Sequence, residues 1–269
     1  MSNPEVQSHP GGRRVLLIGD AVDLLQGIAA ALGEAGSHVE VLIDRKIEPP
    51  LDSRQPDTRA MDTRFSSADL LDRDAVARFA ERYIGESGAP DILCITQSIG
   101  RAQRVVEATA VDWDRDLNEP LHRVAVAIGA ILPSMSVRGC AGVVIAIILS
   151  DGVTPAPAFG VSSVLARAMI GLFESLRAEL QHSPVNVSIV LASRETFLRN
   201  SAVVGEAAAR AIEGRDLYSF AGERDPERIS AYFGPLLAAL AATSTGPPLP
   251  DIGPMGAIYL PENWSGTHS

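Results

Sequence analysis

The sequence of 269 residues is poor in lysine, cysteine and positive charge. Its single lysine is Lys46, and its 23 basic residues face 33 acidic ones, which gives a formal net charge of −10. Nucleic-acid interfaces need clustered lysine and arginine, so this balance argues against DNA or RNA as a partner. The two cysteines, Cys94 and Cys140, provide neither a disulfide framework nor the spacing of a metal site. Cys94 lies in an apolar segment, where we expect a buried and unreactive thiol.

Long hydrophobic runs are also missing. No apolar stretch reaches the roughly 18 residues of a membrane-spanning helix, so we expect no membrane partner. Residues 1–13 are rich in proline, glycine and polar side chains, which favours a disordered tail over a signal peptide or an anchor. Hydrophobic residues still make up 46% of the chain, which is enough for a substantial core. We therefore predict a soluble, cytoplasmic protein with one domain at 14–262 and a short tail at 263–269.

Apolar segments alternate with helical patterns along this domain. The run GVVIAIIL at 142–149 is too uniformly apolar for a half-exposed strand, so it predicts a central strand of a parallel sheet that is covered on both faces. The whole pattern predicts a doubly wound, Rossmann-like α/β fold with about seven parallel strands. The other strands are expected at 14–19, 38–43, near Phe65, and at 89–95, 185–191 and 256–260. Helices are expected at 22–35, 73–84, 113–137, 160–181, 201–215 and 226–242.

In a sheet of this kind the chemistry lies beyond the carboxyl ends of the strands. Asp151 follows the buried strand and is the best candidate for acid/base work, unless it is only a turn residue before Gly152. Ser162 is a weaker candidate, because a serine near a helix start often caps backbone amides. His122 is expected on the surface or at an interface of its helix. Further polar residues at this edge are Asp20, Asp23, Gln97, Ser98, Ser150, Ser163 and 193–195.

The stretch LSDGVTPAPAFGVSSVLARAMIGLFESLRAEL at 149–180 resembles the short-chain dehydrogenase/reductase family, especially its 3-oxoacyl-carrier-protein reductases. The resemblance implies that the family's catalytic serine, tyrosine and lysine fall on Leu149, Ser162 and Ala166, and a structural asparagine on Pro120. None of these four family residues is kept. The chain has four tyrosines and one lysine, and no tyrosine stands four residues before that lysine. A family member lowers the pKa of its tyrosine with the lysine, so Ser162 without a cation cannot take over this proton transfer.

The resembled family also has a loop Thr-Gly-x-x-x-Gly-x-Gly, whose glycines let the backbone approach the pyrophosphate of a dinucleotide. Here only Gly19 is kept, and Asp23 and Leu25 replace the other two glycines. The charge of Asp23 would repel a diphosphate. Asp44 and Asp69 stand where family members contact the adenosine ribose and the adenine, although each is also typical of a solvated turn. We expect no cofactor, and NAD(P) is the alternative.

The resemblance has implications for assembly as well. In the family, the helices that correspond to 113–137 and 160–181 pack against a second subunit, and 201–215 falls in a mobile substrate-binding segment. We therefore expect a homo- or hetero-oligomer that forms through these two helices, with an active paralogue as a candidate partner.

These observations lead to one leading hypothesis and two alternatives for the function. The leading hypothesis is a pseudoenzyme, a non-catalytic subunit that supports an active relative acting on acyl-CoA, acyl-carrier or similar hydroxy or keto substrates. The first alternative is a lyase, isomerase or cyclase that uses the former nucleotide cleft, with a closed pocket lined by Gln97, Asp151 and Ser162. The second is an NAD(P)-dependent oxidoreductase with a displaced site.

Overall fold

The computed structural model describes residues 12–46, 63–214 and 216–222, together with residues 229 and 233. The sheet belongs to a unit that spans Met1–Asp225. The predicted loop at 47–59, the helix at 226–242, the strand at 256–260, the tail at 263–269 and residues 1–11 of the predicted amino-terminal tail lie outside the described residues.

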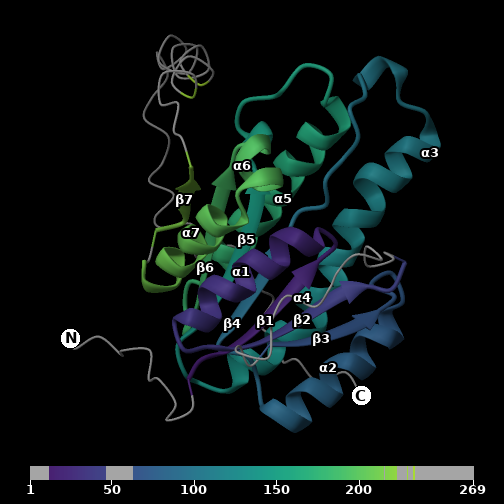
Figure 1. Ribbon diagram of the computed structural model, residues 1–269. Helices are drawn as coiled ribbons and strands as arrows, with labels where there is room; N and C mark the ends of the chain where they lie inside the picture. Colours follow the sequence, from purple (N-terminus) through teal and green to yellow (C-terminus); the bar gives the residue numbers. More distant parts are fainter. Residues whose placement is uncertain (1–11, 47–62, 215, 223–228, 230–232, 234–269) are drawn as a thin grey trace, which may run out of the picture. The chain divides into compact units, whose positions relative to one another are not determined.

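One parallel sheet of seven strands forms the centre of the described chain (Figure 1), which confirms the predicted doubly wound α/β fold. The strand order is β3-β2-β1-β4-β5-β6-β7, so the chain reverses direction across the sheet between β1 and β4. All eight residues of β5 are buried, as its uniform apolar sequence predicts. The strand bounds are β1 Arg14–Gly19, β2 His38–Asp44, β3 Thr63–Ala68, β4 Ile92–Thr96, β5 Gly142–Leu149, β6 Val185–Ala192 and β7 Tyr218–Ala221.

Helices cover the two faces of this sheet. Helix α1 packs beside α7, while α2, α4 and α5 form a second group of neighbours (Figure 1). Each helix turns an apolar stripe toward the strands, and the core consists largely of leucine, isoleucine and valine. The helix bounds are α1 Val22–Glu34, α2 Arg73–Ser87, α3 Ala110–Trp113, α4 Glu119–Val137, α5 Gly160–Glu179, α6 Arg194–Arg199 and α7 Ser201–Glu213.

Two features at the carboxyl-terminal end of the described sheet differ from the sequence prediction. The seventh strand is Tyr218–Ala221, a four-residue segment that the sequence pattern did not indicate. The predicted helix at 201–215 is present as α7 but ends at Glu213. A Cβ added to Gly205 would lie 2.7 Å from the Cβ of Ala31, so α7 packs closely on α1. Glycine allows this approach because it has no side chain.

The predicted helix at 113–137 begins earlier and has a wide turn near its start. Helix α3 continues through a π-helical turn, Asp114–Asn118, into α4. Pro120 follows this turn, and a proline there has no N–H to donate and would clash with the carbonyl four residues earlier, so the wider turn accommodates it. The complete helix, Ala110–Val137, is long and apolar enough by composition to cross a membrane. The expectation from the sequence that no stretch reaches this length is therefore corrected; one such helix is weak evidence of a membrane span, because buried core helices and signal sequences pass the same test.

Candidate functional site

Polar side chains meet at the carboxyl edge of the sheet in two groups. We call the first group the β1 half; it consists of Asp20, Asp44, Ser98 and Arg123, from the ends of β1, β2 and β4 and from α4. We call the second group the β5 half; it consists of Asp151, Ser162 and Arg194, from the ends of β5 and β6 and from α5. Sheets of this kind bind their ligands at this edge, so both halves belong to the candidate site.

Arg123 reaches from α4 into the β1 half. Its Nε lies 3.0 Å from Oδ2 of Asp44, and its Nη1 lies 3.8 Å from Oδ2 of Asp20. The Asp44 side chain is 0% exposed, while that of Arg123 is 16% exposed. The 3.0 Å contact does not have hydrogen-bond alignment, so it is an ion pair held by charge. Asp44, which the resemblance assigns to a ribose, is therefore covered by a guanidinium group.

The space that remains beside Arg123 is very small. A cavity of about 20 Å³ lies between Gly19, Thr96, Pro120 and Arg123. A single water molecule already needs roughly 10–15 Å³ of such space, so this cavity has no room for an adenosine group. Burial raises the pKa of Asp20, although the hydrogen bond from Ser98 and the charge of Arg123 favour its ionised form.

The former glycine loop is adapted to packing. A Cβ on Gly19 would lie 2.0 Å from Oγ1 of Thr96, so this glycine is needed for the close approach of β1 to β4. Leu25 is fully buried in the core. Asp23 is exposed in the first turn of α1, whose start has no side-chain cap. Its carboxylate interacts favourably with the helix dipole at the place where a dinucleotide would put its phosphates.

Two further candidate residues have structural roles. Oδ1 of Asp69 accepts a hydrogen bond of 3.1 Å from the backbone N–H of Leu71, which supports the turn interpretation of Asp69. Gln97 is completely buried, and its Oε1 accepts a 3.0 Å hydrogen bond from the N–H of Leu149. Gln97 therefore joins the ends of β4 and β5.

Arg194 connects the residues of the β5 half. Its Nη2 donates to Oδ2 of Asp151 at 2.7 Å and to Oγ of Ser162 at 3.0 Å. Its Cζ also lies 3.9 Å from the ring centroid of Phe159, close enough for a cation–π contact. The structure thus brings the two predicted catalytic candidates together. The expectation that Ser162 has no cation beside it is wrong, because Arg194 bonds to both side chains. Ser162 is not a helix cap, because α5 has no side-chain cap.

The place where the family carries its lysine is closed by packing. Ala166 is fully buried, and a Cβ added to Gly152 would lie 2.9 Å from the Cβ of Ala166. The turn Ser150–Gly152 therefore lies directly against α5. Leu149, at the position of the family's serine, is also completely buried. These positions have become part of the core.

A loop between β4 and α3 covers Ser162. A Cβ on Gly100 would lie 2.8 Å from the Cβ of Ser162, and a Cβ on Gly160 would lie 2.3 Å from Cγ2 of Val105. Both glycines are therefore points of close contact between the loop and α5. As a result, only 1% of Ser162 is exposed.

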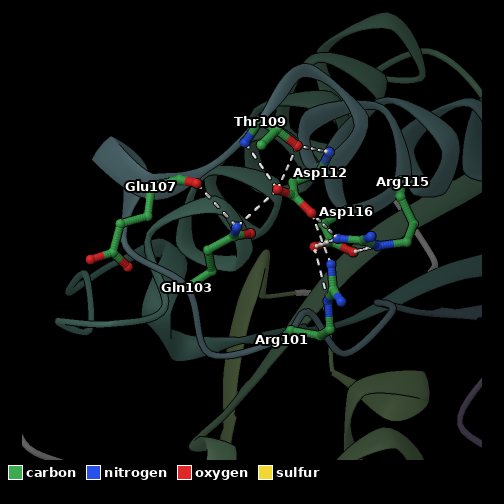
Figure 2. A network of polar contacts seen from close by, with 7 residues as sticks. All are labelled: Arg101, Gln103, Glu107, Thr109, Asp112, Arg115 and Asp116. Atoms are coloured by element: carbon green, nitrogen blue, oxygen red, sulfur yellow. Dashed lines mark hydrogen bonds and ion pairs between the residues drawn. The ribbon is translucent and has the colours of Figure 1, made fainter.

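A charged network fixes this loop to the start of α3, as Figure 2 shows. Oδ1 of Asp112 accepts hydrogen bonds from Arg101 at 2.9 Å and Arg115 at 2.7 Å. Its Oδ2 accepts from Gln103 at 2.9 Å and from the N–H of Thr109 at 2.9 Å. The backbone hydrogen bond from Thr109 and the side-chain bonds lower the pKa of Asp112. The carboxylate therefore stabilises the covering loop in its charged form.

Sequence reasoning missed the two arginines that organise this edge. Arg123 was visible only as a neighbour of His122, which is exposed, and Arg194 only as one of several polar residues after β6. The sequence did contain one sign of these arginines, because several aspartates at the predicted strand ends had no basic partner nearby in the sequence.

Cys94 is buried as predicted, and burial raises the pKa of its thiol to about 12. In the part of the chain that the structure describes, His, Cys, Asp and Glu residues form no group suited to a metal ion.

Comparison with known proteins gives the context of this site. The sequence model of the family described as short chain dehydrogenase matches residues 13–199. An uncharacterised oxidoreductase of Mycobacterium tuberculosis is 30% identical over 187 residues, which cover 66% of this chain and 54% of that protein. The chain thus spans about half the length of the curated relatives that it matches in this way.

Solved structures share the fold at lower identity. A short-chain dehydrogenase from Novosphingobium aromaticivorans has a TM-score of 0.73 at 21% identity, over 89% of this chain and 90% of that chain. A short chain dehydrogenase/reductase from Burkholderia phymatum, solved in complex with NAD, has a TM-score of 0.72 at 15% identity, over 88% and 98% of the two chains.

Proposed function

The chain belongs to the short chain dehydrogenase family, and we propose that within this family it is a non-catalytic subunit that supports an active relative. The observation that carries the proposal is the position of Arg123. Its guanidinium group pairs with Asp44 at 3.0 Å and leaves a cavity of about 20 Å³ beside it. The residues at this edge do not fit a dinucleotide as they are arranged, so the proposal includes no cofactor.

The β5 half supports the same proposal. Proton transfer in this family needs an acid or base with a tuned pKa, and the residue pattern that would supply it is missing from the whole chain. Asp151 and Ser162 are instead bonded to Arg194 at 2.7 and 3.0 Å. The polar atoms of both candidates are thus already engaged by one guanidinium group.

The exposed side of two helices supports the subunit role. The helix Ala110–Val137 and α5 carry apolar side chains that solvent reaches, among them Val111, Val137 and Val164. Apolar surface of this kind is favourable to cover with a partner. We propose that these helices form a homo- or hetero-oligomer in the cytoplasm, with an active paralogue that acts on acyl-CoA, acyl-carrier or related hydroxy and keto substrates.

A second candidate function is an NAD(P)-dependent oxidoreductase with a displaced site. The names of the mycobacterial relatives and the NAD complex of the Burkholderia relative favour it. The lyase, isomerase or cyclase hypothesis has less support. It needs a pocket at Gln97, Asp151 and Ser162, and these side chains are occupied by Leu149 and Arg194.

Co-purification tests the subunit role. Each short-chain dehydrogenase paralogue of the source genome is co-expressed with the tagged chain, and the activity and yield of each paralogue are measured. We expect one paralogue to co-purify and to gain activity or yield. Val164→Glu should abolish this association, whereas Leu198→Glu, at a more exposed apolar position on α6, should not. If no paralogue associates, the subunit proposal is wrong.

A further inference from the structure

The loop between β4 and α3 lies over the start of α5, and we call its residues 99–108 the lid. The close contacts at Gly100 and Gly160 described above join the lid to α5. Beneath it, Ser162 is 1% exposed and accepts a 3.0 Å hydrogen bond from Arg194. The lid therefore keeps solvent from the hydroxyl group of the β5 half.

The lid buries little apolar surface of its own. The side chains of Ile99, Val105 and Val106 are 37%, 49% and 81% exposed. Among the described residues, one backbone hydrogen bond joins the lid to another element, from the N–H of Gly160 to the carbonyl oxygen of Gln103 at 3.0 Å. Segments with few buried apolar contacts open at a lower free energy than the core. The lid therefore has the properties of a segment that can open separately.

Side chains of the lid hold it to the start of α3 (Figure 2). Nη2 of Arg101 and Nε2 of Gln103 each donate to the carboxylate of Asp112 at 2.9 Å. The Arg101 side chain is 61% exposed, so water competes for this contact. Asp112 is also bonded to Thr109 and Arg115, which keep its carboxylate in place when the lid leaves it.

The contact of the lid with α5 lies beside a strained residue. Ala158 has a φ of 66°, in the left-handed region that is unfavourable for a residue with a Cβ atom. Its neighbour Phe159 pairs with Gln103 of the lid in an isolated β-bridge. Strain of this kind persists only where the surrounding structure holds it, and it is common in segments that switch between two positions.

We propose that Asp112 latches the lid shut over Ser162, and that the lid opens transiently while the sheet stays folded. Opening breaks the contacts of Arg101 and Gln103 with Asp112 and lets solvent reach the hydroxyl group of Ser162. It leaves the turn at Gly152 packed on α5, so the position of the family's lysine stays closed. The proposal is independent of the subunit role.

Thiol labelling tests the lid within one molecule. The variant Ser162→Cys/Cys140→Ser has one thiol under the lid and a second, Cys94, which is completely buried in β4. N-ethylmaleimide reaches the first thiol when the lid opens and the second when the sheet opens, and mass spectrometry measures each site. We expect the thiol under the lid to react roughly tenfold or more faster than Cys94, each rate being divided by that in the unfolded chain.

Two substitutions loosen the latch, and each has a matched control. Asp112→Asn should raise the labelling rate under the lid roughly tenfold, because it removes the charge that accepts both hydrogen bonds. Its control is Asp114→Asn, which removes the same charge from a carboxylate that bonds to Asn118 at 2.7 Å and not to the lid.

Arg101→Gln leaves the carboxylate and the cap of α3 intact and should raise the same rate about threefold. Its control is Arg104→Gln, a similarly exposed arginine of the lid that pairs with Glu107 of the lid at 3.3 Å. Both controls should keep the labelling rate within about twofold. Thermal unfolding checks that every variant folds.

Three results would overturn the proposal. The thiol under the lid reacts as slowly as Cys94, so that the lid opens only with the whole sheet. It reacts as fast as in the unfolded chain, so that the lid is never latched. The latch variants and their controls change the rate equally, so that the contacts with Asp112 do not hold the lid. If Ser162→Cys does not fold, hydrogen exchange at the Gly160 amide, compared with the amides of β5 in the unmodified chain, makes the same distinctions.

Discussion

The two halves of the cleft are closed by different means. In the β1 half, the side chain of Arg123 fills the space and pairs with Asp44 at 3.0 Å, and a small cavity remains. In the β5 half, the turn at Gly152 packs against Ala166, with 2.9 Å between the positions of their Cβ atoms. One half is closed by a buried ion pair, and the other mainly by backbone packing.

This difference shows which half a substitution can reopen. A side chain can be removed or can rotate, so the β1 half depends on Arg123. Backbone packing cannot be undone without moving the turn or α5, because protein interiors are close-packed. We therefore expect that changing one side chain can reopen the β1 half but not the β5 half.

The largest expected effect comes from restoring the family's lysine. Ala166→Lys puts a charged side chain where Ala166 is fully buried against Gly152. We expect a loss of roughly 3–5 kcal/mol in the free energy of unfolding, from overpacking and from the buried charge. Urea unfolding measures it. The control Ala178→Lys, at an exposed site of the same helix, should change stability by less than about 0.5 kcal/mol. Equal losses would show that the β5 half is not closed by packing.

A smaller effect separates the ion pairs of the two halves. Asp44→Asn removes the nearest carboxylate from the mostly buried guanidinium of Arg123, which keeps Glu119 at 3.3 Å and Asp20 at 3.8 Å, so we expect a loss of about 2–3 kcal/mol. Asp151→Asn should cost about 1–2 kcal/mol, because Arg194 keeps its contacts with Ser162 and Phe159.

The double variant Asp44→Asn/Arg123→Met gives the matching test of coupling. It removes both charges, so its loss in the free energy of unfolding should be smaller than the sum of the losses caused by Asp44→Asn alone and Arg123→Met alone. Additive losses would mean that the two side chains do not interact.

The sequence predicted the scaffold of this molecule well and its site poorly. Strands such as Gly142–Leu149 are recognisable because a uniform apolar run determines their burial. Tyr218–Ala221 was missed because four partly exposed residues carry too little pattern. The capping interpretation of Ser162 was wrong because the side chain bonds instead to Arg194, which is 32 residues away. Contacts between such distant residues depend on how the elements pack, and no local pattern encodes them.

The smallest expected effect concerns pH. Burial raises the pKa of Asp20, so its ionised form lowers the stability of the folded state, and this cost disappears as the pH falls through the raised pKa. Asp20→Asn should therefore raise the free energy of unfolding at pH 7 and have no effect in strong acid.

For Asp112 the pH dependence of stability has the opposite sign. Its pKa is lowered, so its stabilising charge is present above the ordinary carboxyl pKa and is lost as the pH falls through the lowered one. Thermal unfolding of Asp20→Asn and Asp112→Asn between acid and neutral pH checks both predictions. If both substitutions raise, or both lower, the stability at neutral pH, the comparison is contradicted.

Calorimetric titration of the purified chain with NAD and NADP, each oxidised and reduced, tests the closed cleft most directly. We expect no binding at concentrations up to about 1 mM, because Arg123 pairs with Asp44 and leaves a cavity of only about 20 Å³ beside it. A dissociation constant below about 100 µM, roughly −5.5 kcal/mol, would contradict it and would restore the oxidoreductase interpretation.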